Sequence, residues 1–380
     1  MWLVPALRFP EFSGEWNVCT FKNVCKITTG NKNTQDKVEN GLYPFYVRSQ
    51  NIERINSWTF DGEAILTAGD GVGVGKVFHY SVGKIGVHQR VYILSDFKCN
   101  GKYLYQYFSS HFYNRVKRMS AKNSVDSVRM EMIASMPLSL PSIEEQYKIG
   151  KLLSLLDERI STQNKIIEKY ESLIQALCDT LIEQETQQVT LSFSDFGQSY
   201  SGLSGKSAED FGDGYPFITY MNVYQNQIID LTDVGLVKIN ETEQQSVVRH
   251  GDILLTLSSE TPEEVGMGAV YLGETYPLYL NSFCFGIHVT DEAKIYPPFL
   301  AYYVSSQPFR KAVYPLAQGS TRFNLQKSDF MKKKFSFPVI EKQRIIYSIL
   351  KTYSDKLIVE KQLMRLLCNQ KCYLLRQLFI

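Results

Sequence analysis

The feature that most constrains the fold of this chain is an internal duplication. The matching segments are YPF at 43–45 and 215–217, GEAILT at 62–67 and GDILLT at 251–256, YLYQYFSS at 103–110 and FLAYYVSS at 299–306, and LSLPSIEEQ at 138–146 and FSFPVIEKQ at 335–343. The offset between the copies grows from 172 to 197 residues, so the second copy carries insertions in its early part. Solenoid repeats have periods of about 20–50 residues. A period near 190 residues instead predicts two homologous halves.

Each half ends in a long heptad pattern. Apolar residues recur at alternating spacings of four and three residues, which is typical of a coiled-coil seam. The predicted inter-helix seam comprises Leu153, Leu156, Ile160, Ile167, Tyr170, Ile174 and Leu177 in the first half and Leu350, Tyr353, Leu357, Met364, Leu367 and Leu374 in the second. Ser142 and Glu145 form a capping box that marks the start of the first helix. We expect two helices, at 143–186 and 339–380, each about 60 Å long at about 1.5 Å per residue.

The two predicted helices carry opposite charge. Residues 143–186 contain 5 Lys and Arg against 9 Asp and Glu, and residues 339–380 contain 8 against 3. A globular helix averages about 11–12 residues, so helices of this length need a partner, and opposite charges favour pairing with each other. The second domain begins within a few residues of Leu181, so an antiparallel pair avoids a long return of the chain. This arrangement predicts one domain at each end of the pair, related by an approximate two-fold axis.

The remaining segments, 1–142 and 187–338, have the pattern of mostly β structure. Short alternating or apolar runs are separated by Gly, Pro, Asn and Asp. Each segment also contains one aromatic-rich helix, expected at about 102–116 and 298–312. The predicted fold class is therefore α+β, with two homologous mostly-β domains separated by two long antiparallel coiled-coil helices.

The composition is that of an ordinary globular protein. The 380 residues are 44% hydrophobic and 21% charged, with 41 Lys and Arg against 39 Asp and Glu. No apolar run approaches the roughly 18–20 residues that a membrane span needs, and the N-terminus does not resemble a signal peptide. The seven cysteines include no C-x-x-C pair, which favours reduced thiols over disulfides or a zinc site. We therefore expect a cytoplasmic protein.

Three features that suggest an enzyme do not meet the chemical requirements. GDGVGVGK at 69–76 resembles a phosphate-binding loop, but Asp70 replaces the first glycine and Val77 stands where Ser or Thr is required. YPPF at 296–299 resembles an amino-methyltransferase motif, but Tyr296 has no carboxylate or amide to accept a hydrogen bond from the target amine. The five histidines lack metal-ligand spacing. We therefore predict no catalytic residue, no metal site and no cofactor in this chain.

A basic, polar loop precedes each long helix. Arginine together with Asn, Gln, Ser and Thr is the set of side chains that contacts phosphates and base edges, although a solvated surface is the alternative interpretation. The candidate nucleic-acid contacts are Arg115, Lys117, Arg118, Lys122, Asn123 and Ser124 in the first half and Gly319, Ser320, Thr321, Arg322, Asn324 and Lys327 in the second. The recurrence of such a loop in both halves favours a binding role.

Together these features resemble the specificity subunit of a type I restriction–modification system. The segments that carry the resemblance are VPALRFPEFSGEW at 4–16, QSYSGLSGKSAEDFG at 198–212, YPFITYMNV at 215–223, GDILLT at 251–256, GSTRFNL at 319–325 and the paired P-x-I-E-[EK]-Q starts of the long helices. GVGVGKV at 71–77 resembles the family's glycine hairpin, whereas AKNSVDSV at 121–128 stands where the family has a G-S-T loop. The resemblance adds Lys76, Arg90, Thr219 and Asn222 to the candidate DNA contacts.

The resemblance implies two target-recognition domains joined by two conserved helical regions, with no enzymatic activity in the chain itself. Each domain would read one half of a bipartite, asymmetric site in double-stranded DNA, and the helices would set the gap between the halves. The implied partners are two modification subunits, which carry S-adenosylmethionine and methylate adenine, and a restriction subunit that acts as translocase and nuclease. The competing hypothesis is a coiled-coil scaffold with two β-rich domains that bind peptides or ligands.

The near-neutral total charge conceals large differences along the chain. Residues 1–142 carry 17 Lys and Arg against 11 Asp and Glu, whereas residues 187–338 carry 11 against 16. The acidic second domain then needs a local basic patch to meet a DNA backbone. We expect that the isolated chain binds DNA poorly and that partner subunits supply part of the affinity.

Overall fold

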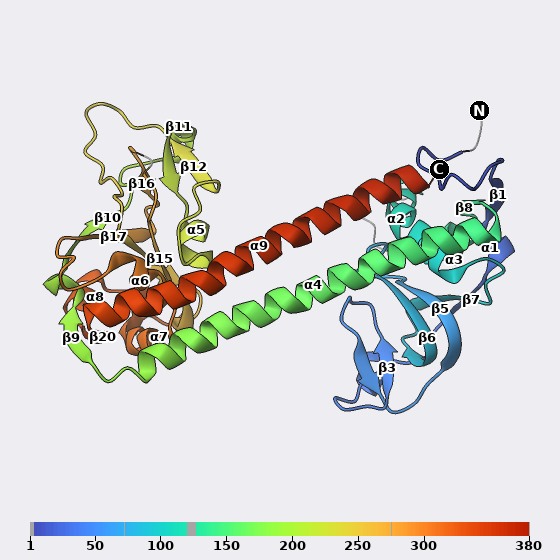
Figure 1. The fold of residues 1–380 in the computed structure, drawn as a ribbon, viewed down its shortest axis with the longest axis horizontal. Coiled ribbons are helices and arrows are strands. Elements are labelled where there is room, and N and C mark those ends of the chain that lie inside the picture. The colour runs from blue at the N-terminus through green and yellow to red at the C-terminus, as the bar shows by residue number, and fades with distance from the viewer. Residues whose placement is uncertain (1–3, 72, 120–126, 275, 380) are drawn as a thin grey trace. The chain divides into compact units, whose positions relative to one another are not determined.

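The structure divides into two compact units. The computed structural model describes residues 4–71, 73–119, 127–274 and 276–379. Unit 1 comprises Met1–Lys165 and Gln362–Ile380, and unit 2 comprises Ile166–Lys361. The two long helices, α4 (Ile143–Glu183) and α9 (Ile340–Leu378), each contribute residues to both units (Figure 1). Helices and strands are mixed in each unit, which confirms the predicted α+β class and both long helices.

In unit 1 the described residues form a six-stranded sheet in the order β2-β7-β5-β6-β3-β4. The elements before α4 are β1 (Asn17–Thr20), α1 (Phe21–Val24), β2 (Lys26–Thr29), β3 (Tyr43–Tyr46), β4 (Glu53–Ile55), β5 (Phe60–Ala68), β6 (Phe78–Val87), β7 (Val91–Ser95), α2 (Gly101–Met119), α3 (Met130–Ala134) and β8 (Pro137–Leu140). Strands β5 and β6 form a long hairpin in which Phe60 lies opposite Ile85 and Thr67 opposite Phe78. The glycine-rich segment 69–77 joins them, as predicted.

The main core of unit 1 forms where helix α2 packs on the sheet. Phe108 and Phe112 of α2 are fully buried, and their ring centroids lie 5.3 and 6.3 Å from that of Phe78 in β6. Edge-to-face pairs of this kind stabilise a core beyond the area they bury. Leu153 from α4 and Leu378 from α9 join the same core, so both long helices are anchored in unit 1.

Unit 2 contains several small sheets among its described residues. Their strand orders are β10-β17-β13-β15, β12-β11-β16, β14-β19-β18 and β20-β9. The elements between α4 and α9 are β9 (Gln188–Ser192), β10 (Gly197–Ser201), β11 (Phe211–Ile218), α5 (Tyr220–Gln225), β12 (Val234–Val237), β13 (Ile253–Thr256), β14 (Ser258–Ser259), β15 (Gly268–Val270), β16 (Tyr279–Leu280), β17 (Cys284–Val289), α6 (Pro297–Tyr303), α7 (Gln307–Val313), β18 (Ala317–Gln318), β19 (Phe323–Leu325), α8 (Lys327–Lys332) and β20 (Lys334–Pro338).

The core of unit 2 is built around aromatic rings. Phe193 is fully buried, and its ring centroid lies 4.8 Å from that of Phe330 and 5.3 Å from that of Phe335. Ile174 from α4 and Leu350 from α9 belong to the same cluster. The apolar faces of both long helices therefore continue into the core of unit 2, as they do in unit 1.

The second aromatic-rich helix is interrupted, so the prediction of a single helix over 298–312 is wrong. A short turn separates α6 from α7. Pro308 lies in the first turn of α7 and has no backbone N–H with which to continue a helix. Ser306 caps α7, because its Oγ accepts a hydrogen bond from Phe309 N at 3.4 Å. In unit 1 the corresponding helix α2 is unbroken and covers the predicted segment 102–116.

The start of α4 in unit 1 and the start of α9 in unit 2 share one arrangement, which we call the frame. It consists of a buried glutamine that bonds two backbone groups and a paired strand before the helix. In unit 1, Gln146 Nε2 donates to Pro141 O at 2.9 Å, and its Oε1 accepts from Asn100 N at 3.0 Å. In unit 2, Gln343 donates to the proline carbonyl at the end of β20 at 2.8 Å and accepts from Tyr296 N at 2.8 Å. Both glutamines are buried. The strand before each helix is also paired, β8 with β1 and β20 with β9, so the duplicated sequence produces a duplicated frame.

The predicted capping box at the start of α4 is only half formed. Ser142 Oγ accepts from Glu145 N at 3.3 Å, as a helix cap does. The Glu145 carboxylate does not return to the backbone of Ser142 but accepts from Arg8 Nε at 2.8 Å and from Arg8 Nη2 at 2.7 Å. Because Glu145 is fully buried, its charge needs this bidentate partner more than a solvated capping glutamate would.

In unit 1 the two long helices run antiparallel. Leu153, near the start of α4, shares a core with Leu378 at the end of α9. Further along α4, Asp157 pairs with Lys371, which precedes Leu378 in α9. The order of the contacts along one helix is therefore reversed along the other.

The same reversal occurs within unit 2. Glu171 Oε1 lies 2.7 Å from Lys361 Nζ, and further along α4 Ile174 shares a core with Leu350, which precedes Lys361 in α9. The ion pairs in both units join an acid of α4 to a lysine of α9. The predicted antiparallel pairing of oppositely charged helices is thus confirmed within each unit.

Candidate nucleic-acid interface

In unit 2 the predicted G-S-T-R segment forms the tip of a β-hairpin. Strands β18 and β19 pair antiparallel, and β14 pairs with the other edge of β19. Gly319 has φ +133°, and a Cβ at this position would lie 2.1 Å from the Arg322 carbonyl oxygen, so the turn requires glycine. Ser320, Thr321 and Arg322 are all exposed. The hairpin therefore presents two hydroxyls and a guanidinium to solvent.

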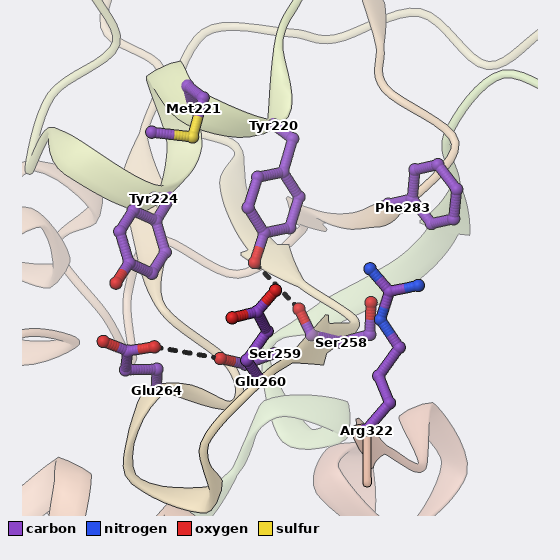
Figure 2. Close-up of a pocket in the computed structure, with 9 residues that line it drawn as sticks. All are labelled: Tyr220, Met221, Tyr224, Ser258, Ser259, Glu260, Glu264, Phe283 and Arg322. Carbon is purple, nitrogen blue, oxygen red and sulfur yellow. Dashed lines mark hydrogen bonds between the residues drawn. The ribbon is translucent and has the colours of Figure 1, made fainter. Parts of the chain in front are cut away.

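Arg322 borders a hollow of about 300 Å³ in unit 2. Figure 2 shows Arg322 and Phe283 on one side of it, and Tyr224 and Glu264 on the other. The lining residues are Tyr220, Met221, Tyr224, Ser258, Ser259, Glu260, Glu264, Phe283 and Arg322. Arg322 forms no hydrogen bond or ion pair with any residue that the structure describes. Its five N–H donors are therefore available to a ligand.

Hydrogen bonds fix the polar side of this hollow. Tyr220 Oη donates to a backbone carbonyl of β14 at 2.8 Å, and Ser259 Oγ donates to Glu264 Oε2 at 3.1 Å. A hydrogen bond from Tyr224 lowers the pKa of Glu264, and the same bond raises the pKa of Tyr224. Glu264 is therefore an anion at neutral pH. The hollow combines the donors of Arg322 with carboxylate acceptors, which suits the mixed donor and acceptor edges of DNA bases.

The other predicted residues near the hairpin differ in availability. Asn324 is exposed on β19. Lys327 is partly buried, and its Nζ donates to Ser201 Oγ at 3.1 Å. Arg310 belongs to the same basic segment but is structural, because its guanidinium donates to three backbone carbonyls of segment 263–266 at 2.6, 2.7 and 2.8 Å. The accessible polar groups are therefore concentrated at the hairpin tip.

Asn222 does not present its side chain to a ligand, which corrects its prediction as a contact, whereas the half-buried Thr219 stays a candidate. Thr219 is the N-cap of α5, and its Oγ1 accepts from Asn222 N at 3.2 Å. Asn222 is fully buried, and its Nδ2 donates to Asp230 O at 2.7 Å and to Asp233 O at 2.6 Å. A polar residue in a loop-like sequence pattern can thus form buried hydrogen bonds inside the unit. The sequence alone does not distinguish such a residue from a surface contact.

In unit 1 the prediction of a loop at Arg115, Lys117 and Arg118 is wrong, because helix α2 continues to Met119 and contains all three residues. Arg115 Nε donates to Met132 O at 2.9 Å, and its Nη2 donates to Ser135 Oγ at 2.9 Å, so this side chain joins α2 to α3. Lys117 and Arg118 are exposed at the C-terminal end of α2. The predicted contacts Lys122, Asn123 and Ser124 lie outside the described residues.

A second basic group in unit 1 lies around the glycine-rich segment. Lys76 is exposed, and its Nζ lies 5.3 Å from the centroid of the Tyr113 ring. Arg90 is exposed and approaches Asp70. Arg48, which the sequence analysis missed, pairs with the same carboxylate. Because Arg48 and Asp70 are separated by 22 residues and several turns, no local pattern signals that they meet.

None of the thirteen predicted seam residues in α4 and α9 is exposed. Four of them are buried, namely Leu153, Ile174, Leu350 and Leu367. The others are partly buried, as expected for the flanks of a two-helix interface. Their pairing across the seam stays a prediction.

No three or more His, Cys, Asp or Glu side chains gather into a possible metal site in the part of the chain that the structure describes. Across the same residues, no helix is both long and apolar enough to cross a membrane.

Comparisons with known proteins identify the family. The model of the type I restriction modification DNA specificity domain matches residues 13–172 and again residues 192–367. The type I restriction enzyme MjaVIII specificity subunit of Methanocaldococcus jannaschii is 24% identical over 400 residues, which cover 94% of this chain and 89% of that protein. The EcoDI specificity subunit of Escherichia coli is 24% identical over 160 residues, which cover 42% of this chain and 35% of that protein.

The fold agrees with this family. The crystal structure of the type I restriction–modification S subunit from M. genitalium has a TM-score of 0.65 and 16% sequence identity, with 99% of each chain covered. A second structure, from work on complex assembly in a type I system, has a TM-score of 0.54 and 14% identity over 96% of this chain and 97% of that one. With two copies of the specificity domain that together span most of its length, the chain belongs to the type I restriction–modification DNA specificity family.

Proposed function

We propose that the two units of this DNA specificity protein read the two halves of a bipartite, asymmetric site in double-stranded DNA. The observation that carries the proposal is the doubled specificity domain within one chain. The hairpin tip with its unpaired Arg322 supports base contacts by unit 2, and the pair of Arg48 and Arg90 on Asp70 supports them by unit 1. Because the two surfaces use different residues, they suit two different half-sites.

In this proposal the chain docks two modification subunits on α4 and α9. Exposed apolar side chains on both helices support such docking, namely Tyr147 (57% exposed) and Leu155 (53%) on α4 and Leu366 (65%) and Tyr373 (58%) on α9. The modification subunits supply S-adenosylmethionine and methylate adenine, and a restriction subunit completes the complex. The chain contributes recognition and spacing but no catalytic group, and it meets its DNA in the cytoplasm.

Mapping the methylated adenines in cells that express this chain with its modification subunits tests the proposal. We expect one bipartite site with two different halves and a fixed gap. The absence of a bipartite site would contradict the proposal. If, in addition, the purified complex captured peptides and showed no affinity for duplex DNA, the scaffold hypothesis would replace it.

A deletion of one heptad from each long helix tests whether the helices set the gap between the half-sites. Removing residues 160–166 from α4 and residues 364–370 from α9 deletes one heptad from each helix and keeps the seam in phase. The helices shorten by about 10 Å. At about 3.4 Å per base pair this corresponds to a gap about three base pairs shorter, with unchanged half-sites. An unchanged gap would show that the helices do not set the spacing.

A further inference from the structure

Two arginines of unit 1 converge on one carboxylate. Arg48 Nη1 lies 2.9 Å from Asp70 Oδ1, and Arg90 Nε lies 3.7 Å from Asp70 Oδ2. The Arg48 side chain is 44% exposed and that of Arg90 is 65% exposed, whereas that of Asp70 is 26% exposed. The cluster therefore carries a net positive charge and keeps most of its guanidinium donors open to solvent.

The backbone that presents Asp70 is fixed from two sides. Gly69 N donates to Arg90 O at 2.8 Å, and Gly69 O accepts from Val128 N at 2.7 Å. Asp70 itself forms an antiparallel β-bridge with Ser127. Backbone groups of two other segments, at residue 90 and at residues 127–128, thus fix the backbone that carries the carboxylate, and the carboxylate accepts a hydrogen bond from Arg48.

The glycine-rich segment passes directly over Arg48. A Cβ on Gly73 would lie 2.5 Å from the Arg48 carbonyl oxygen, which no side chain can accommodate. Gly71 has φ +81°, and a Cβ there would lie 3.8 Å from Arg48 Nη1. These contacts explain why a sequence that fails as a phosphate-binding loop is nevertheless rich in glycine. Gly73 allows the backbone to approach Arg48, whereas Gly71 is required by its positive φ.

His88 holds the second arginine in place. His88 Nδ1 accepts a hydrogen bond from Arg90 N at 3.0 Å. Burial lowers the pKa of His88, and the nearby Arg48 cation lowers it further. The imidazole is therefore neutral at pH 7, as it must be to accept this bond.

We propose that Arg48, oriented by Asp70, recognises a guanine in the half-site that unit 1 reads, an inference that rests on the proposed function above. A guanidinium donates two parallel hydrogen bonds to O6 and N7 of guanine in the major groove. A side chain already held in one orientation loses less conformational entropy when it binds. The Asp70 carboxylate offsets part of the arginines' charge, which weakens attraction of the cluster to a phosphate more than its hydrogen bonding to the uncharged edge of a base.

The test compares matched variants of the complete complex with its modification subunits. Arg48→Lys keeps the positive charge but cannot form the bidentate pair, because an ammonium is a point charge. Arg54→Lys is the control, since Arg54 also lies in unit 1 but donates to the backbone carbonyls of Gly41 and Leu42 at 2.9 and 3.1 Å. The probes are duplexes that carry the mapped site and duplexes in which one guanine at a time is replaced by adenine.

The expected result is a loss of discrimination at one position. Arg48→Lys should reduce the preference for guanine there by about 5- to 150-fold, and Arg54→Lys should leave it intact. Asp70→Asn should also reduce this preference while it raises affinity for unrelated DNA, because a negative charge is removed. A variant that is merely misfolded would lose both kinds of binding.

Two outcomes would overturn the inference. If Arg48→Lys weakened binding equally for every duplex, Arg48 would be a phosphate contact. If no guanine position changed its preference in either half-site, Arg48 would not read a base. Failure of the proposed function is distinct from both, since the wild-type complex would then methylate no bipartite site at all.

Discussion

Units 1 and 2 start their long helices from the same frame but with opposite charges. In unit 1 the entering segment brings the cation Arg8 to the buried anion Glu145. In unit 2 the entering segment brings the anion Glu185 to the cation Lys342, with Nζ 3.4 Å from Oε2. The residue before the buried glutamine of the frame is thus Glu145 in one copy and Lys342 in the other. Hydrogen-bond geometry is common to the two copies, while the sign of the charge differs between them.

The candidate DNA-reading surfaces of the two units also differ. Unit 1 holds two arginines on one aspartate beneath a glycine-rich segment, whereas unit 2 presents a single unpaired Arg322 beside a hollow that contains Glu264. The frame is therefore the common part of the two units, and the loops carried on it are the variable part. This division is what an asymmetric target requires, because the two halves need different contacts on equivalent supports.

Burial should make the two charge pairs unequal in energy. Glu145 is fully buried, so Arg8→Ala leaves an uncompensated charge and should destabilise unit 1 by about 3–5 kcal/mol. The Lys342 side chain is 39% exposed, so Lys342→Ala should cost less than about 1 kcal/mol. All three tryptophans lie in Met1–Lys165, so urea unfolding of the full chain followed by tryptophan fluorescence reports on unit 1, and hydrogen exchange reports on unit 2.

A double variant controls for lost packing of the Arg8 side chain. Arg8→Ala combined with Glu145→Gln removes the buried charge together with its partner and should recover much of the stability. Equal costs for Arg8→Ala and Lys342→Ala, or no recovery in the double variant, would contradict the difference in burial.

Loss of the buried glutamine of the frame should destabilise the two units by similar amounts. Gln146→Met and Gln343→Met keep the length of the side chain but remove its polar groups. Each variant leaves one backbone N–H, that of Asn100 or Tyr296, without its acceptor, at a cost of about 1–3 kcal/mol. Hydrogen exchange should accelerate at the Asn100 amide in the first variant and at the Tyr296 amide in the second. Acceleration in only one variant would show that the frames are not energetically equivalent.

Acid should weaken unit 1 through its histidines. Burial lowers the pKa of His79, His88 and His111 in the folded state. The unfolded chain then binds more protons than the folded one below pH 6.5, so stability falls as the pH drops through that value. The expected loss is less than about 0.7 kcal/mol per histidine between pH 6.5 and 6.0. In tryptophan-detected unfolding, His79→Gln should reduce the slope, and an unchanged slope would remove His79 from this account.

Sequence reasoning recovered the features that repeat or have a period. The heptad spacing predicted both long helices, the residue counts predicted their opposite charges, and the short connection after Leu181 predicted their antiparallel pairing. The matching P-x-I-E-[EK]-Q segments predicted equivalent helix starts. The break between α6 and α7 was missed although Pro308 is visible in the sequence, since the aromatic pattern continues across it.

The candidate sites were less predictable because they depend on contacts between distant segments. The G-S-T-R segment was recognisable as one contiguous stretch, and it is exposed. Asn222 was predicted as a DNA contact but is buried inside unit 2. Its burial depends on the folded unit and leaves no local mark in the sequence. Arg48 was missed because only the folded sheet brings it to Asp70. Tyr220 and Tyr224 both line the hollow and lie four residues apart on α5. This spacing is a local pattern from which the hollow could have been suspected.

The most direct test of two different readers in one chain is a methylation map of three complexes, with the wild-type chain, Arg48→Lys and Arg322→Ala. We expect the wild-type complex to methylate one bipartite site. Arg48→Lys should relax one position in one half of that site, and Arg322→Ala should relax or weaken the other half, by about 1–3 kcal/mol of discrimination each. Relaxation of the same half by both variants, or equal loss in both halves, would contradict the assignment of one half-site to each unit.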